Sequence, residues 1–217
     1  MTPASLLTTV RNQLYETDSS GFWTDSELRN YMWHGEIEIA DHVKCMERTT
    51  STTTVTATSS YTLTSDCDYL NRVLWNNYKL KRIDYSELQM LDQPGYGSTY
   101  ITGKPTHYYV YGESIGLWPI PDSSKSLRYY YYAQPAEVTT DSTVFSIPSM
   151  FHPYIQDYVL WRAYAKDQDD GRAVFHKKIW EENMSKAYRK WVYRNNTDKY
   201  NVVKDEDNFP TSELGII

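Results

Sequence analysis

The order of two kinds of pattern along the chain limits its fold more than any other sequence feature. Apolar residues recur at helical spacing near both ends, within residues 3–46 and again within 153–194. The region between them, residues 61–133, has short strand-like runs separated by turn residues. We therefore predict an α+β fold, in which the N- and C-terminal helices form a bundle, an antiparallel β-sheet or small barrel is inserted between them, and an extended C-terminal tail follows.

The same patterns divide the chain into three parts. Residues 1–48 and 148–194 are expected to form a helical core domain, residues 49–147 an inserted antiparallel β domain, and residues 195–217 an extended C-terminal arm. No apolar run approaches the roughly 18 residues that span a bilayer, and no signal-peptide pattern opens the chain. We therefore expect no membrane partner.

The clearest helix start lies at Thr24. Thr24 and Glu27 have the spacing of a capping box, and Trp23 and Leu28 have the spacing of a hydrophobic staple. The helix should run over residues 25–46, and its apolar stripe consists of Leu28, Met32, Gly35, Ile39, Val43 and Met46. Three acidic residues lie off this stripe, so we expect a solvated acidic face from Glu36, Glu38 and Asp41.

Three further helices are expected. Thr2 followed by Pro3 is typical of an N-cap with proline at the first helical position, so the first helix should cover residues 3–16. Near the other end, helical patterns over 153–166 and 172–194 are interrupted at Asp169-Asp170-Gly171. They predict an αα-hairpin.

Turn residues mark the hairpins of the inserted region. Asn76-Asn77 should turn the strands of residues 72–80, and Gly112 should turn those of residues 107–118. In the run 127–133, alternate residues should share a face, with Leu127, Tyr129 and Tyr131 on one side and Arg128, Tyr130 and Tyr132 on the other. Ten of the twelve residues in 49–60 are Ser or Thr, which indicates an exposed strand or an extended linker.

Tyrosine is the compositional outlier. The chain has 21 Tyr and 7 Trp but only 5 Phe, whereas cores are usually filled with residues that carry no polar atom. Two interpretations remain open: aromatic surfaces at subunit contacts, or a β-rich protein whose strands favour aromatics. The net charge of −6 argues against a protein that coats DNA by neutralising phosphates.

Signatures of enzymes and cofactor sites are lacking. The sequence has no Gly-rich phosphate loop and no Gly-x-Ser-x-Gly elbow, its five histidines are scattered, and its two cysteines, Cys45 and Cys67, cannot build a zinc site alone. We therefore expect no catalytic residues, no metal and no cofactor.

Two segments are candidates for contacts with partners. The helix over 172–194 carries a basic row that could face DNA or an acidic partner surface, or could be a solvated face: Lys177, Lys178, Lys186, Arg189, Lys190 and Arg194. Residues 195–217 are too polar to fold alone and too apolar at their end to be a solubility tail. Because fixing each backbone residue costs about 1–2 kcal/mol, this arm should need contacts with another chain.

An ordered set of short patterns resembles one protein family. After the N-terminal helix comes Phe22-Trp23-Thr24-Asp25-Ser26-Glu27-Leu28, and the later patterns are Tyr61-Thr62-Leu63, Leu70-Asn71-Arg72-Val73, Gly103-Lys104-Pro105 before Tyr108-Tyr109, Leu127-Arg128-Tyr129, and the helix with Tyr158, Leu160, Arg162 and Ala163. In this order, over about residues 5–194, the chain resembles the head-to-tail adaptor proteins of tailed bacteriophages, also called connector or head-completion proteins. It departs from the family pattern at Thr64, where relatives often have proline.

The resemblance implies a structural virion protein rather than an enzyme. Such proteins form a homo-oligomeric ring, usually of twelve copies, at the neck below the portal vertex, after assembly in the host cytoplasm. The ring joins the portal protein to a tail or nozzle protein, and genome DNA passes through its channel during ejection without sequence-specific binding. The resemblance also implies that the C-terminal arm, from about residue 195 to 217, binds the portal. Within this arm we expect the contacts to be made by Tyr200, Val202, Val203, Phe209, Leu214, Ile216 and Ile217.

One alternative function fits the aromatic composition. A carbohydrate-binding or tail-fibre-like module could use a Tyr- and Trp-rich sheet as a stacking platform. It differs from the adaptor hypothesis in oligomeric state and in glycan affinity.

Overall fold

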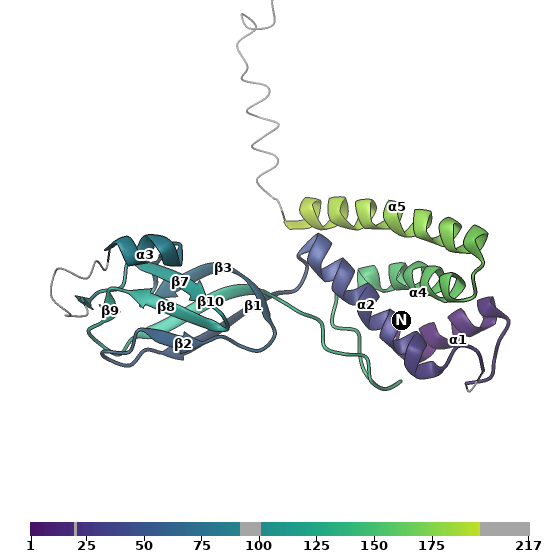
Figure 1. The fold of residues 1–217 in the computed structure, drawn as a ribbon, viewed down its shortest axis with the longest axis horizontal. Coiled ribbons are helices and arrows are strands. Elements are labelled where there is room, and N and C mark those ends of the chain that lie inside the picture. The colour runs from purple at the N-terminus through teal and green to yellow at the C-terminus, as the bar shows by residue number, and fades with distance from the viewer. Residues whose placement is uncertain (20, 92–100, 196–217) are drawn as a thin grey trace, which may run out of the picture. The chain divides into compact units, whose positions relative to one another are not determined.

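The computed structural model describes residues 1–19, 21–91 and 101–195, and it confirms the α+β fold class. The chain forms two compact units (Figure 1). The helical unit consists of Met1–Cys45 and the chain from Glu137 onward, and the inserted unit is Met46–Ala136. Residues 137–147, which we expected in the inserted domain, are thus grouped with the helices.

Among the described residues, the helical unit contains four α-helices and one short 3-10 helix. Their bounds are Pro3–Leu14 (α1), Asp25–Val43 (α2), Ser149–Phe151 (η1), His152–Lys166 (α4) and Asp170–Asn195 (α5). Helix α4 packs against α1, α2 and α5, so the N- and C-terminal helices share one core (Figure 1). Gly35 permits the close approach of α2 to α4, because a Cβ atom there would lie 3.2 Å from the Tyr158 ring.

Local sequence explains both N-terminal helix starts. Thr2 and Ser5 form a reciprocal capping box, and Pro3 occupies the first turn of α1. Thr24 Oγ1 accepts a hydrogen bond from the Glu27 N–H at 3.3 Å, which confirms Thr24 as the N-cap of α2. Both members of the expected staple, Trp23 and Leu28, are buried.

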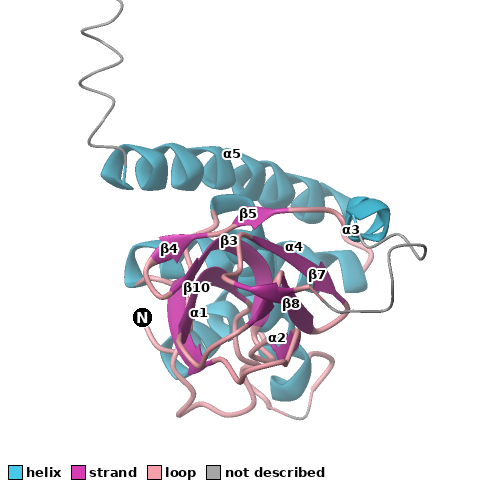
Figure 2. Ribbon diagram, turned by 90° about the vertical axis from the view of Figure 1, so that its left-hand side faces the viewer, coloured by secondary structure: helices cyan, strands magenta, loops and turns pink. Residues whose placement is uncertain are grey.

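The inserted unit holds all the described strands and one short helix (Figure 2). One sheet has the order β1-β10-β3-β4, formed by Glu47–Thr53, Ser126–Ala133, Cys67–Trp75 and Tyr78–Lys79. The second has the order β2-β8-β7-β5, formed by Ser60–Thr62, Ser114–Trp118, His107–Tyr111 and Lys81–Arg82. Helix α3 covers Tyr85–Leu91, and the short strands β6 (Thr102–Gly103) and β9 (Ile120–Pro121) pair with each other.

Most strand pairs are antiparallel, as the hairpin signals predict. Asn76 and Asn77 have positive φ angles of 45° and 66° in the tight turn between β3 and β4, and Gly112 has a φ of 56° between β7 and β8. Two short pairs, β5 with β7 and β6 with β9, are parallel instead. The Ser/Thr-rich run supplies β1, which is exposed along most of its length, so the strand alternative is confirmed for this part.

Candidate interaction surfaces

The basic row of α5 is exposed along its whole length. All six predicted residues, Lys177 to Arg194, are exposed. One forms a weak ion pair, between Lys177 Nζ and Glu181 Oε1 at 3.9 Å, and Arg189 Nε donates to the Ser185 carbonyl at 3.2 Å. The row is therefore a largely uncompensated positive surface of the helical unit.

The seven residues predicted to bind the portal, from Tyr200 to Ile217, lie outside the described residues.

The expected solvated acidic face is wrong at Glu36. Glu38 and Asp41 are exposed, but Glu36 is fully buried. Its Oε1 accepts hydrogen bonds from the backbone N–H groups of Ser146 at 2.6 Å and Ile147 at 3.2 Å. The physical reason is spacing: Glu36 follows Met32 by four residues and precedes Ile39 by three, so it lies on the apolar stripe of α2.

Burial changes the ionisation of Glu36. Desolvation raises the pKa of its carboxyl group from 4.5 to about 7, although the hydrogen bonds from Ile147 and Ser146 favour the charged form. Its second oxygen, Oε2, has no hydrogen-bond partner among the described residues. Nearby, both ring nitrogens of buried His152 face carbonyl oxygens, of Ile147 at 2.9 Å and of Met1 at 3.1 Å. These contacts hold the segment before α4 and do not create an open site.

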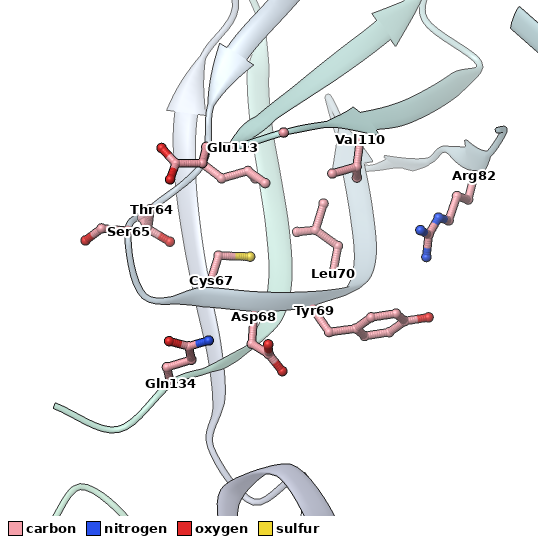
Figure 3. A pocket seen from close by; sticks show the side chains of 12 residues that line it. Thr64, Ser65, Cys67, Asp68, Tyr69, Leu70, Arg82, Val110, Glu113 and Gln134 are labelled. Atoms are coloured by element: carbon pink, nitrogen blue, oxygen red, sulfur yellow. The ribbon is translucent and has the colours of Figure 1, made fainter. Parts of the chain in front are cut away.

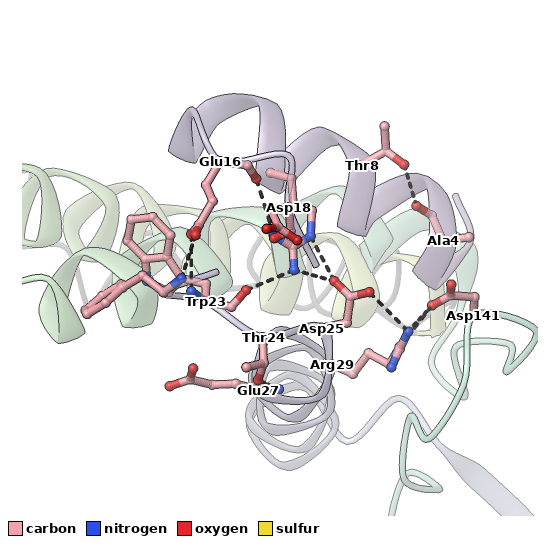
Figure 4. Close-up of polar contacts among 12 residues, drawn as sticks. Ala4, Thr8, Glu16, Asp18, Trp23, Thr24, Asp25, Glu27, Arg29 and Asp141 are labelled. Atoms are coloured by element: carbon pink, nitrogen blue, oxygen red, sulfur yellow. Dashed lines mark hydrogen bonds and ion pairs between the residues drawn. The ribbon is translucent and has the colours of Figure 1, made fainter. Parts of the chain in front are cut away.

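A second polar network fixes the loop between α1 and α2 (Figure 4). The buried Arg11 guanidinium donates to Asp25 Oδ1 from Nε at 2.8 Å and to the carbonyl oxygens of Asp18 at 2.5 Å and Trp23 at 2.9 Å. Arg29 extends the network, because it pairs with Asp141 at 2.8 Å. All three guanidinium nitrogens of Arg11 have partners within the unit, which indicates a structural role.

The inserted unit contains a recess of about 380 Å³ (Figure 3). It lies at the start of β3 beside the β7–β8 hairpin, and its lining includes Cys67, Asp68, Tyr69, Arg82 and Glu113. Burial, with the charges of Asp66 and Asp68, raises the pKa of the Cys67 thiol to about 11, so the thiol is protonated and unreactive near neutral pH. The recess is therefore a poor place for nucleophilic chemistry.

Residues 1–19, 21–91 and 101–195 contain no group of three or more His, Cys, Asp or Glu side chains that could hold a metal ion. Within the same ranges, no helix combines the length and the hydrophobicity needed to span a bilayer.

The polar outer face of the β1-β10-β3-β4 sheet is a surface that the sequence indicated only in part. Alternation in 127–133 correctly separates the buried Leu127, Tyr129 and Tyr131 from Arg128, Tyr130 and Tyr132. It could not show which residues of β1, β3 and β4 lie beside them, because strand order and register are set by contacts between distant segments.

Comparison with known protein families gives a match to nearly the whole chain. The family model described as SU10 adaptor protein matches residues 1–203, which include every described residue of both units. No curated protein matches the chain.

Proposed function

The chain belongs to the SU10 adaptor protein family, and from this premise we propose that it forms a ring that joins the portal of a bacteriophage capsid to the tail. Membership makes it a structural adaptor of a phage, in a family of proteins that are in general not enzymes. The observation that carries the proposal is the match over 1–203, because it includes the bundle, the insert and the start of the C-terminal arm.

The proposed mechanism is geometric. Copies of the helical unit stand side by side around a channel at the neck of the virion, and genome DNA passes through it without sequence-specific contacts. The exposed basic row of α5 supports a role in contact with an acidic neighbouring surface or with DNA. Glu36 cannot line the channel, because its side chain is buried in its own subunit.

The C-terminal arm is proposed to fasten the ring to the portal. Its apolar residues Phe209, Leu214, Ile216 and Ile217 would supply the buried contacts, since removal of apolar area from water contributes about 25 cal/mol per Å², which must exceed the entropic cost of ordering the arm. Tail or nozzle proteins would bind the opposite side of the ring.

Deletion of residues 196–217 tests the proposal. Electron micrographs of the purified full-length protein mixed with its portal should show rings on the portal, and the deletion variant should lose portal attachment while it still melts cooperatively. As a matched control, a variant with Asp205→Asn, Glu206→Gln and Asp207→Asn keeps the apolar residues and should still attach. Retained attachment after the deletion would exclude the arm as the fastening element, and a glycan-binding monomer without rings would contradict the proposed function.

A further inference from the structure

We propose that the outer face of the β1-β10-β3-β4 sheet binds a carboxylate-rich segment of another protein. This face, the Tyr/Arg face, consists of Tyr69, Arg72, Lys79, Arg128, Tyr130 and Tyr132. The inference deepens the proposed function and rests on it in one respect, that the inserted unit makes contacts with other virion proteins.

The strand register places these residues on one surface. Residues directly opposite in an antiparallel pair share a face, so three rows cross the sheet. The first row is Glu47, Tyr132 and Tyr69, and the second is Thr49, Tyr130 and Arg72. The third is Ser51, Arg128, Leu74 and Lys79. The opposite face holds Leu127, Tyr129 and Tyr131, which are buried in the unit's core.

A β-bulge adds to this surface. Tyr130 pairs with Arg72 and Tyr131 with Leu70, so Asn71 is an extra residue in β3. Bulges re-aim side chains, and here both Asn71 and Arg72 are exposed. Beside them lies a hollow of about 210 Å³, lined by Thr49, Asn71 and Tyr130 among others. The face thus has a hollow into which a partner side chain could fit, and it has hydrogen-bonding groups beside this hollow.

Charge indicates the chemistry of the partner. Arg72, Lys79 and Arg128 are exposed, and none of them forms an ion pair with a residue that the structure describes. A fourth cation, Arg82, lies over the Tyr69 ring at 5.7 Å. Glu47 is the single acidic residue in the three rows. In a chain of net charge −6, this local excess of guanidinium groups favours a partner with carboxylates, which arginine binds with two parallel hydrogen bonds.

The tyrosines favour a protein partner over single-stranded nucleic acid. Nucleic-acid platforms need free aromatic faces on which bases stack. The Tyr69 ring is instead stacked on Tyr132, with centroids 6.3 Å apart and planes 22° from parallel, and is also contacted by Arg82. Tyr and Arg side chains are enriched at the centres of protein interfaces, where the phenol combines apolar area with a hydrogen bond.

The test uses full-length protein and a fluorescein-labelled peptide of alternating glutamate and glycine, followed by fluorescence anisotropy in about 0.15 M NaCl. The same peptide with glutamine in place of glutamate is the probe control, and should bind about tenfold more weakly or worse, as expected for lost charge-assisted hydrogen bonds. The double variant Arg72→Gln/Arg128→Gln should weaken binding of the acidic peptide by about tenfold. Both positions are exposed, and an unchanged melting curve verifies the fold.

A matched variant distinguishes binding at this face from a general effect of the protein's net charge. Arg162→Gln/Arg172→Gln removes two arginine charges from exposed positions of the helical unit that lie outside the basic row of α5, and should change peptide affinity by less than about twofold. Equal losses in both double variants, or no binding of the acidic peptide by the unaltered protein, would overturn the proposal. If the protein bound an oligothymidine more tightly than the acidic peptide, and the Arg72/Arg128 variant abolished that binding, the face would be assigned to nucleic acid and the proposal would be overturned too.

The outcomes also distinguish this inference from the proposed function. If rings form on the portal but the acidic peptide does not bind, this inference fails alone; if the peptide binds but no rings form, the proposed function fails alone.

Discussion

Glu36 joins two segments that are far apart in sequence. Its carboxylate accepts hydrogen bonds from the backbone N–H groups of Ser146 and Ile147, which follow it in the sequence by 110 and 111 residues. No cation forms an ion pair with it among the described residues. The burial of a carboxylate without a cation disfavours its charged form, which is why its pKa rises.

This pKa predicts a pH-dependent stability of the helical unit. A carboxyl group with a pKa of about 7 in the folded state and 4.5 otherwise binds its proton more tightly when folded. Its contribution to stability is therefore complete below pH 4.5 and is lost as the pH rises to about 7, by about 3 kcal/mol in total. Urea unfolding of the wild type and of Glu36→Gln, measured from pH 4.5 to 7.5, should show this loss in the wild type only.

Glu38→Gln is the matched control for this titration. Glu38 lies two residues away on α2 and is exposed, so its loss should leave the pH profile of the wild type unchanged. Parallel profiles for wild type and Glu36→Gln would contradict the raised pKa of Glu36. The burial of Glu36 could have been predicted from the sequence, because Leu28, Met32, Glu36, Ile39 and Val43 have helical spacing. The predicted apolar stripe contained Gly35 instead, and therefore left out Glu36.

At the scale of elements, the start of α2 depends on Trp23. The indole is buried and its Nε1 donates to the Ala163 carbonyl of α4 at 3.1 Å. Lys166 of α4 also pairs with Glu27 of α2 at 2.5 Å. Burial raises the pKa of Glu27, but hydrogen bonds from Lys166 and Tyr31, the Lys166 charge and the Thr24 N–H outweigh it and lower this pKa overall. The N-terminus of α2 is thus attached to the C-terminal turn of α4.

Two substitutions separate the packing of Trp23 from its hydrogen bond. Trp23→Ala should destabilise the helical unit by about 3–5 kcal/mol, since a buried aromatic side chain is removed. Trp23→Phe keeps most of the packing and should cost about 1–2 kcal/mol, chiefly because the indole hydrogen bond to the Ala163 carbonyl is lost, although the Asp167 N–H still donates to that carbonyl at 3.2 Å. Chemical denaturation of both variants measures the difference, and equal losses would contradict a role for the indole N–H.

Glycines in the β7–β8 hairpin give a second prediction at this scale. A Cβ atom at Gly116 would lie 2.0 Å from Cζ of Tyr109, the residue opposite it, so Gly116→Ala must displace that ring. It should destabilise the inserted unit by about 1–3 kcal/mol. A Cβ atom added at Gly112 would have no neighbouring side chain or backbone atom within 4 Å. Gly112→Ala should therefore reduce stability by about 1 kcal/mol, through the positive φ angle alone. If thermal unfolding showed a larger loss of stability for Gly112→Ala than for Gly116→Ala, the predicted clash of Gly116→Ala with Tyr109 would be contradicted.

Local signals predicted most elements, and non-local contacts explain what they missed. The Thr24 cap, the Asn76-Asn77 turn and the Gly112 turn each act within a few residues, so they can be recognised in the sequence. The pairing of β1 with β10, in which Glu47 faces Tyr132, joins segments 85 residues apart, and the bulge at Asn71 depends on that sheet. The Tyr/Arg face follows from this register, which is why strand alternation alone predicted only its β10 members.

At the scale of the molecule, the helix–sheet–helix order of patterns predicted an insertion. The chain passes between the two units at two points, after Cys45 and after Ala136. The helical unit is completed only when residues from Glu137 onward return to α1 and α2, so its folding requires a loop of about ninety residues to close. Loop closure entropy grows only slowly with length, by about 0.6 kcal/mol per doubling, so an insert of this size is compatible with a stable bundle.

Because each unit has its own core, substitutions in different units should act independently. We expect the stability losses of Trp23→Phe and Gly116→Ala to add within about 0.5 kcal/mol in the double variant, as they do for distant sites. Hydrogen exchange resolved by peptide should show faster exchange only in residues 1–45 and 137–195 for Trp23→Phe, and only in residues 46–136 for Gly116→Ala. Faster exchange across both units in either single variant would show that the two fold as one cooperative body, and that the insert stabilises the bundle as well as presenting the Tyr/Arg face.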